Sequence, residues 1–194
     1  EQALLRGEAD LAVHSLKDVP VIMTPGLAVE HVLARATPYD AAVSASGEPL
    51  EALRAGSRVG TSSLRRQCLL LAARPDLLVT DLRGNVDTRV GKLDAGEYDA
   101  IILACAGLER LGLGHRINQV LKPPHWLPAS TQGIIGLQHR VNDGSTAALI
   151  GPLHNADAGA QALAERAVAT VLRGSCQVPL AAFAELNSGQ LSVQ

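Results

Sequence analysis

Short runs of aliphatic residues alternate with helical patterns along most of this chain of 194 residues. Continuous apolar runs of about four to eight residues are typical of strands that are buried on both faces, with helices covering them. The alternation predicts an α/β fold with largely parallel sheets. Because Trp, Tyr and Phe together number only four, aliphatic side chains must build the core. No apolar run reaches the roughly 18 residues that a membrane-spanning helix needs.

The expected elements follow from this pattern and from the turn residues between them. The predicted strands are 11–14, 27–33, 41–44, 58–60, 77–82, 100–103, 134–138 and 177–186. The predicted helices are 63–73, 86–95, a short helix at Leu108, and 147–173 with a break near Gly151. The segment 121–130 holds three prolines in ten residues and is expected to be a connection. The segment 187–189 predicts a hairpin turn with little strand after it.

Charge is distributed unevenly along the chain. The whole chain has a net charge of -2, which excludes a globally basic nucleic-acid binder and an acidic disordered tail. Residues 54–92, however, hold eight cations and three acids, a net charge of +5. This segregation implies an anionic partner for that part of the chain. No aromatic residue lies between Tyr39 and Tyr98, so single-stranded nucleic acid would find no stacking platform there.

Two predicted strand-to-helix junctions concentrate the positive charge. The first is VGTSSLRR (59–66). Gly60 allows a ligand to approach the backbone closely, and a hydroxyl of residues 61–63 can cap the helix. Arg65 and Arg66 then lie in the first turn of this helix. Free N–H groups, hydroxyls and guanidinium groups at a helix N-terminus form an anion site.

In the second junction, DLRGNVDTR (81–89), Arg83 ends the strand and Arg89 lies in the next helix. Cations in a first helical turn are unfavourable against the helix dipole unless an anion compensates them. The pattern therefore indicates either a solvated basic face or a site for a ligand with several carboxylates or phosphates. Arginine rather than lysine favours planar oxygen pairs, and we expect Arg65 and Arg83 at an exposed ligand face.

Asp18, beside Lys17, follows a predicted strand. Ligands bind at that position in α/β domains, although a turn aspartate ahead of Pro20 is the alternative. His14 is expected to pack at the end of the sheet rather than to act as a catalyst.

The three cysteines form no CxxC and no cluster with zinc-ligand spacing, so no metal site is predicted. Their sparse, odd number fits a reducing compartment. Cys68 and Cys105 lie in apolar contexts and are expected to be core thiols. Cys176 lies on a predicted loop, where it is either a reactive or an inert thiol.

Five segments, taken together, resemble the porphobilinogen deaminases, also called hydroxymethylbilane synthases. In chain order they are VHSLKDVP (13–20), VGTSSLRRQ (59–67), LRGNVDTR (82–89), GEYDAIILACAGLERLGL (96–113) and CQVP (176–179). The resemblance implies two periplasmic-binding-protein-like α/β lobes joined by hinge strands, plus a small α/β C-terminal domain. It assigns 1–34 and 133–151 to domain 1, 39–127 to domain 2 and 156–194 to domain 3. Compared with the family pattern, we expect both ends of the chain to be truncated.

The resemblance also implies a cytoplasmic, monomeric transferase of tetrapyrrole, porphyrin and heme biosynthesis. Such an enzyme joins four porphobilinogen molecules head to tail, with loss of ammonia, into the linear hydroxymethylbilane. A covalent dipyrromethane cofactor primes the reaction. The implied partner is porphobilinogen, and neither nucleic acid nor membrane is expected.

The site residues are implied position by position. Asp18 matches the catalytic aspartate, and Cys176 matches the cysteine that carries the cofactor through a thioether. Side chains that match those holding the cofactor and substrate carboxylates are Lys17, Thr61, Ser63, Arg65, Arg66, Arg83, Arg89 and Gln132. Ser175 and Thr131 stand where the family usually has Gly, and Gln138 stands where an acid is common. A non-catalytic two-lobed anion-binding protein is the alternative; it would need the arginines but neither Asp18 nor Cys176.

Overall fold

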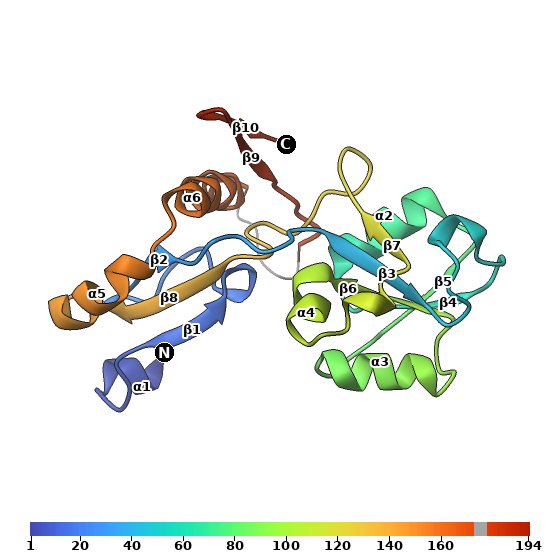
Figure 1. Ribbon diagram of the computed structural model, residues 1–194, viewed down its shortest axis with the longest axis horizontal. Helices are drawn as coiled ribbons and strands as arrows, with labels where there is room; N and C mark the ends of the chain where they lie inside the picture. Colours follow the sequence, from blue (N-terminus) through green and yellow to red (C-terminus); the bar gives the residue numbers. More distant parts are fainter. Residues whose placement is uncertain (173–177) are drawn as a thin grey trace. The chain divides into compact units, whose positions relative to one another are not determined.

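The computed structural model describes residues 1–172 and 178–194 and divides them into two compact units (Figure 1). Unit 1 comprises 1–36, 129–172 and 182–194, and unit 2 comprises 37–128 and 178–181. Residues 122–134, where the chain returns to unit 1, contain no helix or strand, which confirms the expected connection. The three predicted domain ranges stay predictions.

Unit 1 is built on a three-stranded antiparallel sheet in the order β1-β8-β2. Its strands and helices are β1 (Ala12–Ser15), β2 (Leu27–Val32), β8 (Ile135–Arg140), α1 (Gln2–Leu5), α5 (Gly144–Ile150) and α6 (Ala156–Val171). Helix α6 contributes Ala158 and Ala162 to a core that also contains Leu16 and Val32. The predicted break near Gly151 is confirmed, because a 3-10 turn (Gly151–Leu153) separates α5 from α6.

The C-terminal part of unit 1 is a hairpin of β9 (Ala184–Asn187) and β10 (Gln190–Val193). The predicted strand 177–186 is wrong over 178–183, which is neither strand nor helix and contains Pro179. The expectation of little strand after the turn is also wrong. Ser188 and Gly189 both have positive φ values (51° and 80°), and such two-residue loops direct the following residues back against the first strand.

Unit 2 contains a five-stranded sheet in the order β5-β4-β6-β3-β7. Its strands are β3 (Asp40–Ser44), β4 (Arg58–Gly60), β5 (Leu78–Thr80), β6 (Ala100–Ala104) and β7 (Gln119–Leu121). Strand β4 is parallel to β5 and β6, whereas β3 is antiparallel to β6 and β7. The α/β class is confirmed, but the expectation of largely parallel sheets is wrong: the chain enters unit 2 along β3, which runs opposite to its neighbours.

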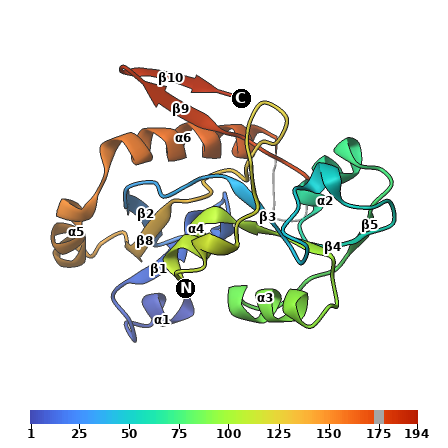
Figure 2. The same ribbon diagram turned by 45° about the vertical axis from the view of Figure 1, so that its right-hand side comes forward.

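Both faces of the central strands β3 and β6 are buried, as the continuous apolar strands predict. Along β6, Ile101 and Leu103 point into one core, and Ala100 and Ile102 into the other. The helices that contribute are α2 (Leu64–Ala73) on the Ile102 side and α3 (Val86–Asp94) and α4 (Cys105–Arg110) on the Ile101 side. Figure 2 shows α2 on one side of the sheet and α3 on the other. In the part of the chain that the structure describes, no helix is long and apolar enough to cross a membrane.

Candidate functional site

Unit 1 presents the predicted catalytic aspartate directly after β1. The chain makes a 3-10 turn there (Leu16–Asp18), which is anchored because the Leu16 side chain is buried and its N–H donates to the Ile134 carbonyl at 2.9 Å. Asp18 is exposed, and no hydrogen bond or ion pair to its carboxylate occurs among the described residues. Lys17 Nζ donates to Gln132 Oε1 at 3.2 Å. The fold therefore brings together three predicted site residues from two distant segments.

The backbone around Gln132 is held by a buried ion pair. Arg35 donates from Nε to the Gln132 carbonyl at 3.0 Å and pairs through Nη1 with Glu165 at 2.6 Å. The Thr131 N–H donates to the same Glu165 carboxylate. Thr131 has a φ of 59°, in the left-handed region that β-branched residues rarely adopt. This conformation explains why glycine is usual at that position in the family pattern.

In unit 2 the two positively charged junctions lie side by side. Strands β4 and β5 are parallel neighbours, so their carboxyl ends meet at one edge of the sheet. Ser62 and Leu82 connect the junctions: Ser62 Oγ donates to the Leu82 carbonyl and accepts from the Leu82 N–H, each at 3.0 Å. The tandem arrangement inferred from the sequence is thus a spatial one.

The first junction has the local structure that its sequence predicts. Ser63 caps α2, with its Oγ accepting from the Arg66 N–H at 3.5 Å, and the Ser63 N–H donates to Thr61 Oγ1 at 3.3 Å. Gly60 packs so closely against Tyr98 that a Cβ there would lie 2.8 Å from the ring. The strand therefore turns into the helix without room for a side chain at Gly60.

Arg65 and Arg66 are buried against Asp40, a residue that the sequence analysis did not single out. Arg65 Nη2 lies 2.6 Å and Arg66 Nη2 2.7 Å from the Asp40 carboxylate, which also accepts from Trp126 Nε1 at 2.8 Å. The expected exposure of Arg65 is therefore wrong. Its other donor, Nη1, binds the Leu127 carbonyl at 2.7 Å. The signal for Asp40 was present: two arginines in a first helical turn need a compensating anion.

The charges of this cluster depend on one another. Burial raises the pKa of Asp40, but the Arg66 and Arg65 guanidinium groups outweigh burial and hold the pKa well below its usual range. Burial, together with repulsion from Arg66, lowers the pKa of Arg65, although Asp40 opposes this shift. A guanidinium has five N–H groups, so Asp40 does not use all the donors of either arginine.

The second junction is more open. The Arg83 side chain is 83% exposed and lies 3.5 Å from the exposed carboxylate of Asp81. Arg89, half-buried in α3, donates from Nε to the Gly84 carbonyl at 2.8 Å. Burial and the positive charge of Arg66 lower the pKa of Arg89. A further anion near these cations would relieve their repulsion.

The remaining candidate residues of the sequence are the cysteines and His14. Cys105 is buried, and burial, followed by the Glu109 and Asp40 charges, raises the pKa of its thiol to about 11, so the expected core thiol is confirmed. Cys68 is exposed on α2, and the expectation of a core thiol there is wrong because the helix buries its opposite face. His14 lies in β1 with Nε2 2.9 Å from Gln138 Oε1, and Cys176 lies outside the described residues.

Two family profiles match this chain. The profile described as "Porphobilinogen deaminase, dipyromethane cofactor binding domain" matches residues 1–148, and "Porphobilinogen deaminase, C-terminal domain" matches residues 160–194. The chain belongs to the porphobilinogen deaminase family. It is therefore a transferase of tetrapyrrole and heme biosynthesis that polymerises porphobilinogen with a dipyrromethane cofactor.

Solved structures similar to this chain show the fold alone. A putative methionine-binding lipoprotein from Bacillus subtilis is 12% identical, with a TM-score of 0.53, and the match covers 81% of this chain and 75% of that one. A putative lipoprotein from Actinomyces odontolyticus is 15% identical, with a TM-score of 0.53 and coverages of 81% and 74%. Protein PG110 from Staphylococcus aureus is 14% identical, with a TM-score of 0.52 and coverages of 85% and 75%. The periplasmic-binding-protein-like α/β class is thereby confirmed.

The donors in the described residues suit the family's cofactor. Dipyrromethane carries acetate and propionate groups, and carboxylates are bound best by guanidinium, ammonium and helix N-terminal N–H groups. Donors of these kinds are present within each unit: Lys17 in unit 1, and Arg83, Arg89 and the N-terminus of α2 in unit 2.

Proposed function

We propose that Asp18 is the catalytic residue of the porphobilinogen deaminase reaction in this chain. The observation that supports this role is the exposed carboxylate, held on an anchored turn and without a partner among the described residues. A carboxylate with a structural role would be paired or buried, as Asp40 is.

In this proposal the Asp18 carboxylate stabilises positive charge in the substrate. Loss of ammonia from porphobilinogen leaves a methylene-pyrrole cation, whose pyrrole N–H can donate to a carboxylate. A fixed negative charge beside that N–H lowers the energy of the developing cation. The cofactor, when bound, supplies the pyrrole α-carbon that attacks. Lys17, held by Gln132, orients a substrate carboxylate near the same turn.

The proposed anion-binding residues of unit 2 hold the acetates and propionates. Arg83 and Arg89 bind carboxylates directly, with Thr61 and Ser63 adding hydroxyl groups at the N-terminus of α2. Arg65 and Arg66 also donate to the Leu127 and Ile102 carbonyls, and they offer the N–H groups that remain. Each charge-assisted hydrogen bond contributes about 1.5–3 kcal/mol, so several of them can hold a polyanionic chain.

Replacing Asp18 by Asn tests the catalytic role. Asp18→Asn keeps the side-chain shape but removes the charge, so porphobilinogen consumption should slow at least about a hundredfold. The exposed turn tolerates the change, and thermal unfolding should be unchanged. Asp157→Asn, which removes an exposed carboxylate at the start of α6, is the matched control and should keep its rate. A near-normal rate in Asp18→Asn would overturn the assignment.

Replacing Arg83 by Leu tests the anion-binding role. Because the Arg83 side chain is 83% exposed, Arg83→Leu should leave stability unchanged while cofactor assembly or chain elongation is impaired at least about tenfold. The products are resolved by the number of rings bound per protein, read from the intact mass. Arg110→Leu, at an exposed arginine in α4, is the control. Normal elongation in folded Arg83→Leu would assign that residue a structural role instead.

The remaining parts of the proposal rest on family membership. Cys176 carries the cofactor through a thioether, the enzyme is a monomer in the cytoplasm, and it binds neither nucleic acid nor membrane. Residues 1–34 with 133–151, 39–127 and 156–194 act as three domains.

A further inference from the structure

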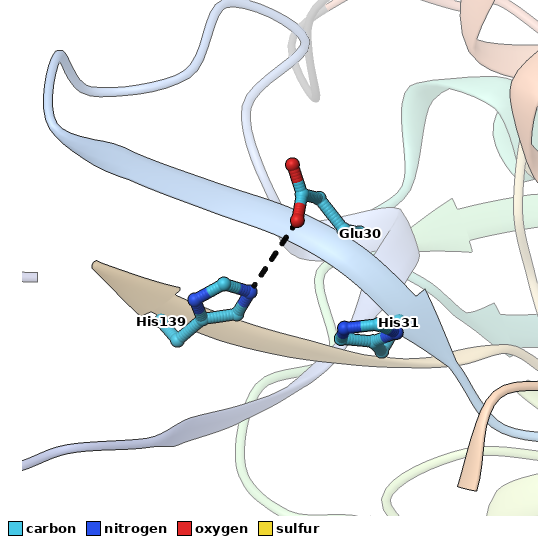
Figure 3. Close-up of side chains that lie close together, drawn as sticks. All are labelled: Glu30, His31 and His139. Carbon is cyan, nitrogen blue, oxygen red and sulfur yellow. Dashed lines mark ion pairs between the residues drawn. The ribbon is translucent and has the colours of Figure 1, made fainter. Parts of the chain in front are cut away.

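A second group of chemically active side chains lies in unit 1, on residues that the proposed reaction does not use. Glu30 and His31 belong to β2 and His139 belongs to β8 (Figure 3). One potential ligand atom from each of the three lies within 4.8 Å of the others. Two imidazoles and a carboxylate are the donor set that binds Zn²⁺ and related divalent ions.

A β-bulge creates this arrangement. Strand β2 pairs Ala28 with His139 and His31 with Leu137, so β2 has one residue more than β8 over this stretch. In a regular strand Glu30, not His31, would share a face with Ala28, because side chains alternate. The extra residue turns His31 onto the His139 face while Glu30 remains within reach of it. The two histidines stack with their ring centroids 5.8 Å apart.

The His139 ring has an unsatisfied nitrogen. Its Nδ1 lies 2.9 Å from the Arg140 carbonyl, which can only accept, so Nδ1 carries the proton. In the neutral ring, Nε2 then has a free lone pair. The His139 side chain is 1% exposed, and Nε2 has no hydrogen-bond partner among the described residues. A buried acceptor without a partner is costly, and it points to a ligand that donates a hydrogen bond to Nε2 or accepts its electron pair.

The group facing this lone pair is another acceptor. Glu30 Oε2 lies 3.8 Å from His139 Nε2, and the Glu30 side chain is 64% exposed. Two electron-rich atoms at this separation repel unless a cation lies between them. For tetrahedral Zn²⁺ with ligand distances of about 2.0–2.2 Å, two ligand atoms are about 3.4 Å apart. A small rotation of the exposed Glu30 side chain supplies the difference.

The surroundings fix the second imidazole. His154 packs edge-on against His31, with the centroids 5.8 Å apart, and His154 Nδ1 accepts from the Val32 N–H at 3.2 Å. Gly159 lets the His154 ring approach: a Cβ there would lie 2.8 Å from it. The edge-on contact limits the orientations open to the His31 ring.

We propose that Glu30, His31 and His139 bind a divalent transition-metal ion of the Zn²⁺ class, which joins β2 to β8. The three residues leave one coordination position open to water. The spacing of ligands along the chain predicts no metal site, because these three residues come from two distant strands that a bulge brings into one cluster.

The test is a Zn²⁺ titration of the chelator-treated full chain by calorimetry. Exposed thiols are first alkylated in every sample, because Cys68 is exposed and thiols bind Zn²⁺. We expect one saturable site with a dissociation constant in the micromolar range or below, and tetrahedral Co²⁺ absorption bands in a parallel titration. Glu30→Gln and His31→Ala should each weaken binding at least about tenfold. Glu97→Gln and His115→Ala, at exposed residues of unit 2, are the matched controls and should bind as the wild type does.

The results separate the metal site from a simple ion pair. The proposal is overturned if no saturable binding occurs, or if Glu30→Gln and His31→Ala bind Zn²⁺ like the controls. Another overturning result is a Glu30→Gln variant that is destabilised only below about pH 6 and regardless of Zn²⁺, since that is the behaviour of a histidinium–carboxylate pair. Both variants are compared after circular dichroism shows native folding, and His139, being buried, is left intact.

Discussion

At the scale of single residues, Asp40 has large consequences for the stability of unit 2. It is completely buried at the start of β3 and accepts from Arg65, Arg66 and Trp126. Its single negative charge offsets part of the positive charge of the two guanidinium groups at the start of α2. The repulsion between these buried cations is thereby reduced in the free protein.

Asp40→Asn should be among the most destabilising single changes in unit 2. The amide keeps the shape but leaves two buried cations uncompensated, so the free energy of unfolding should fall by about 3–5 kcal/mol in urea titrations. Asp94→Asn is the contrasting control, because it breaks an exposed ion pair with Arg116 and should cost less than about 1 kcal/mol. Equal effects of the two changes would contradict this account of Asp40.

The same carboxylate predicts a pH dependence. The folded pKa of Asp40 lies below the ordinary value of 3.8, so the stability it contributes is present above about pH 4 and is lost as the pH falls further. Between pH 4 and pH 2 the wild-type protein should therefore lose more stability than Asp40→Asn does. Parallel slopes in thermal melts across this range would show that Asp40 is not the group responsible.

At the scale of elements, two glycines of unit 2 should respond in opposite directions to the same change. Gly60→Ala places a Cβ 2.8 Å from the buried Tyr98 ring, whose hydroxyl is tied to the Asp81 carbonyl at 2.6 Å, and should cost about 1–3 kcal/mol. Gly91 lies in α3 with no atom within 4 Å of an added Cβ, and Gly91→Ala should stabilise by about 0.5–1 kcal/mol. Chemical denaturation measures both, and a neutral Gly60→Ala would refute the close approach.

Sequence patterns predicted an element well where residues close together in the chain determine it. The bounds of β4, a hydroxyl cap among residues 61–63 and the break near Gly151 are all encoded within a few residues. The predictions that were wrong concern residues whose burial depends on partners far away in the sequence. Cys68 and Arg65 both lie on α2, and which of them is buried is decided by Asp40 and the sheet rather than by local hydrophobicity.

The sequence did not predict the direction of β3 or the cluster of Glu30, His31 and His139, for the same reason. Nothing within 40–44 states that β3 runs opposite to β6, and the bulge that joins His31 to His139 exists only once two distant strands pair. The family motifs, by contrast, predicted Lys17, Asp18 and Gln132 as one group, and the structure brings Lys17 and Gln132 into contact.

At the scale of the whole molecule, Glu165 ties the C-terminal hairpin to the rest of unit 1. Its fully buried carboxylate accepts from Arg35 and from the N–H groups of Thr131 and Ala184. Glu165→Gln replaces an acceptor by a donor, so the free energy of unfolding should fall by about 3–5 kcal/mol and amide exchange in β9 should accelerate. Hydrogen exchange with mass spectrometry measures this, with Glu97→Gln as the exposed control. Unchanged protection of the β9 amides from exchange would show that Glu165 does not hold the hairpin in place.

The strand order of unit 1 has a consequence for the newly made chain. Strands β1 and β2 both pair with β8, which leaves the ribosome only after all of 37–128. Within unit 2, however, Asp40 pairs with Leu121, so folding of unit 2 brings its two ends together. The free loop between β2 and β8 then shrinks from roughly 100 residues to roughly 20, which lowers the entropic cost of closing it by about 1–1.5 kcal/mol. We therefore expect that, during synthesis, unit 2 folds before the sheet of unit 1 forms and brings β2 and β8 closer together along the chain.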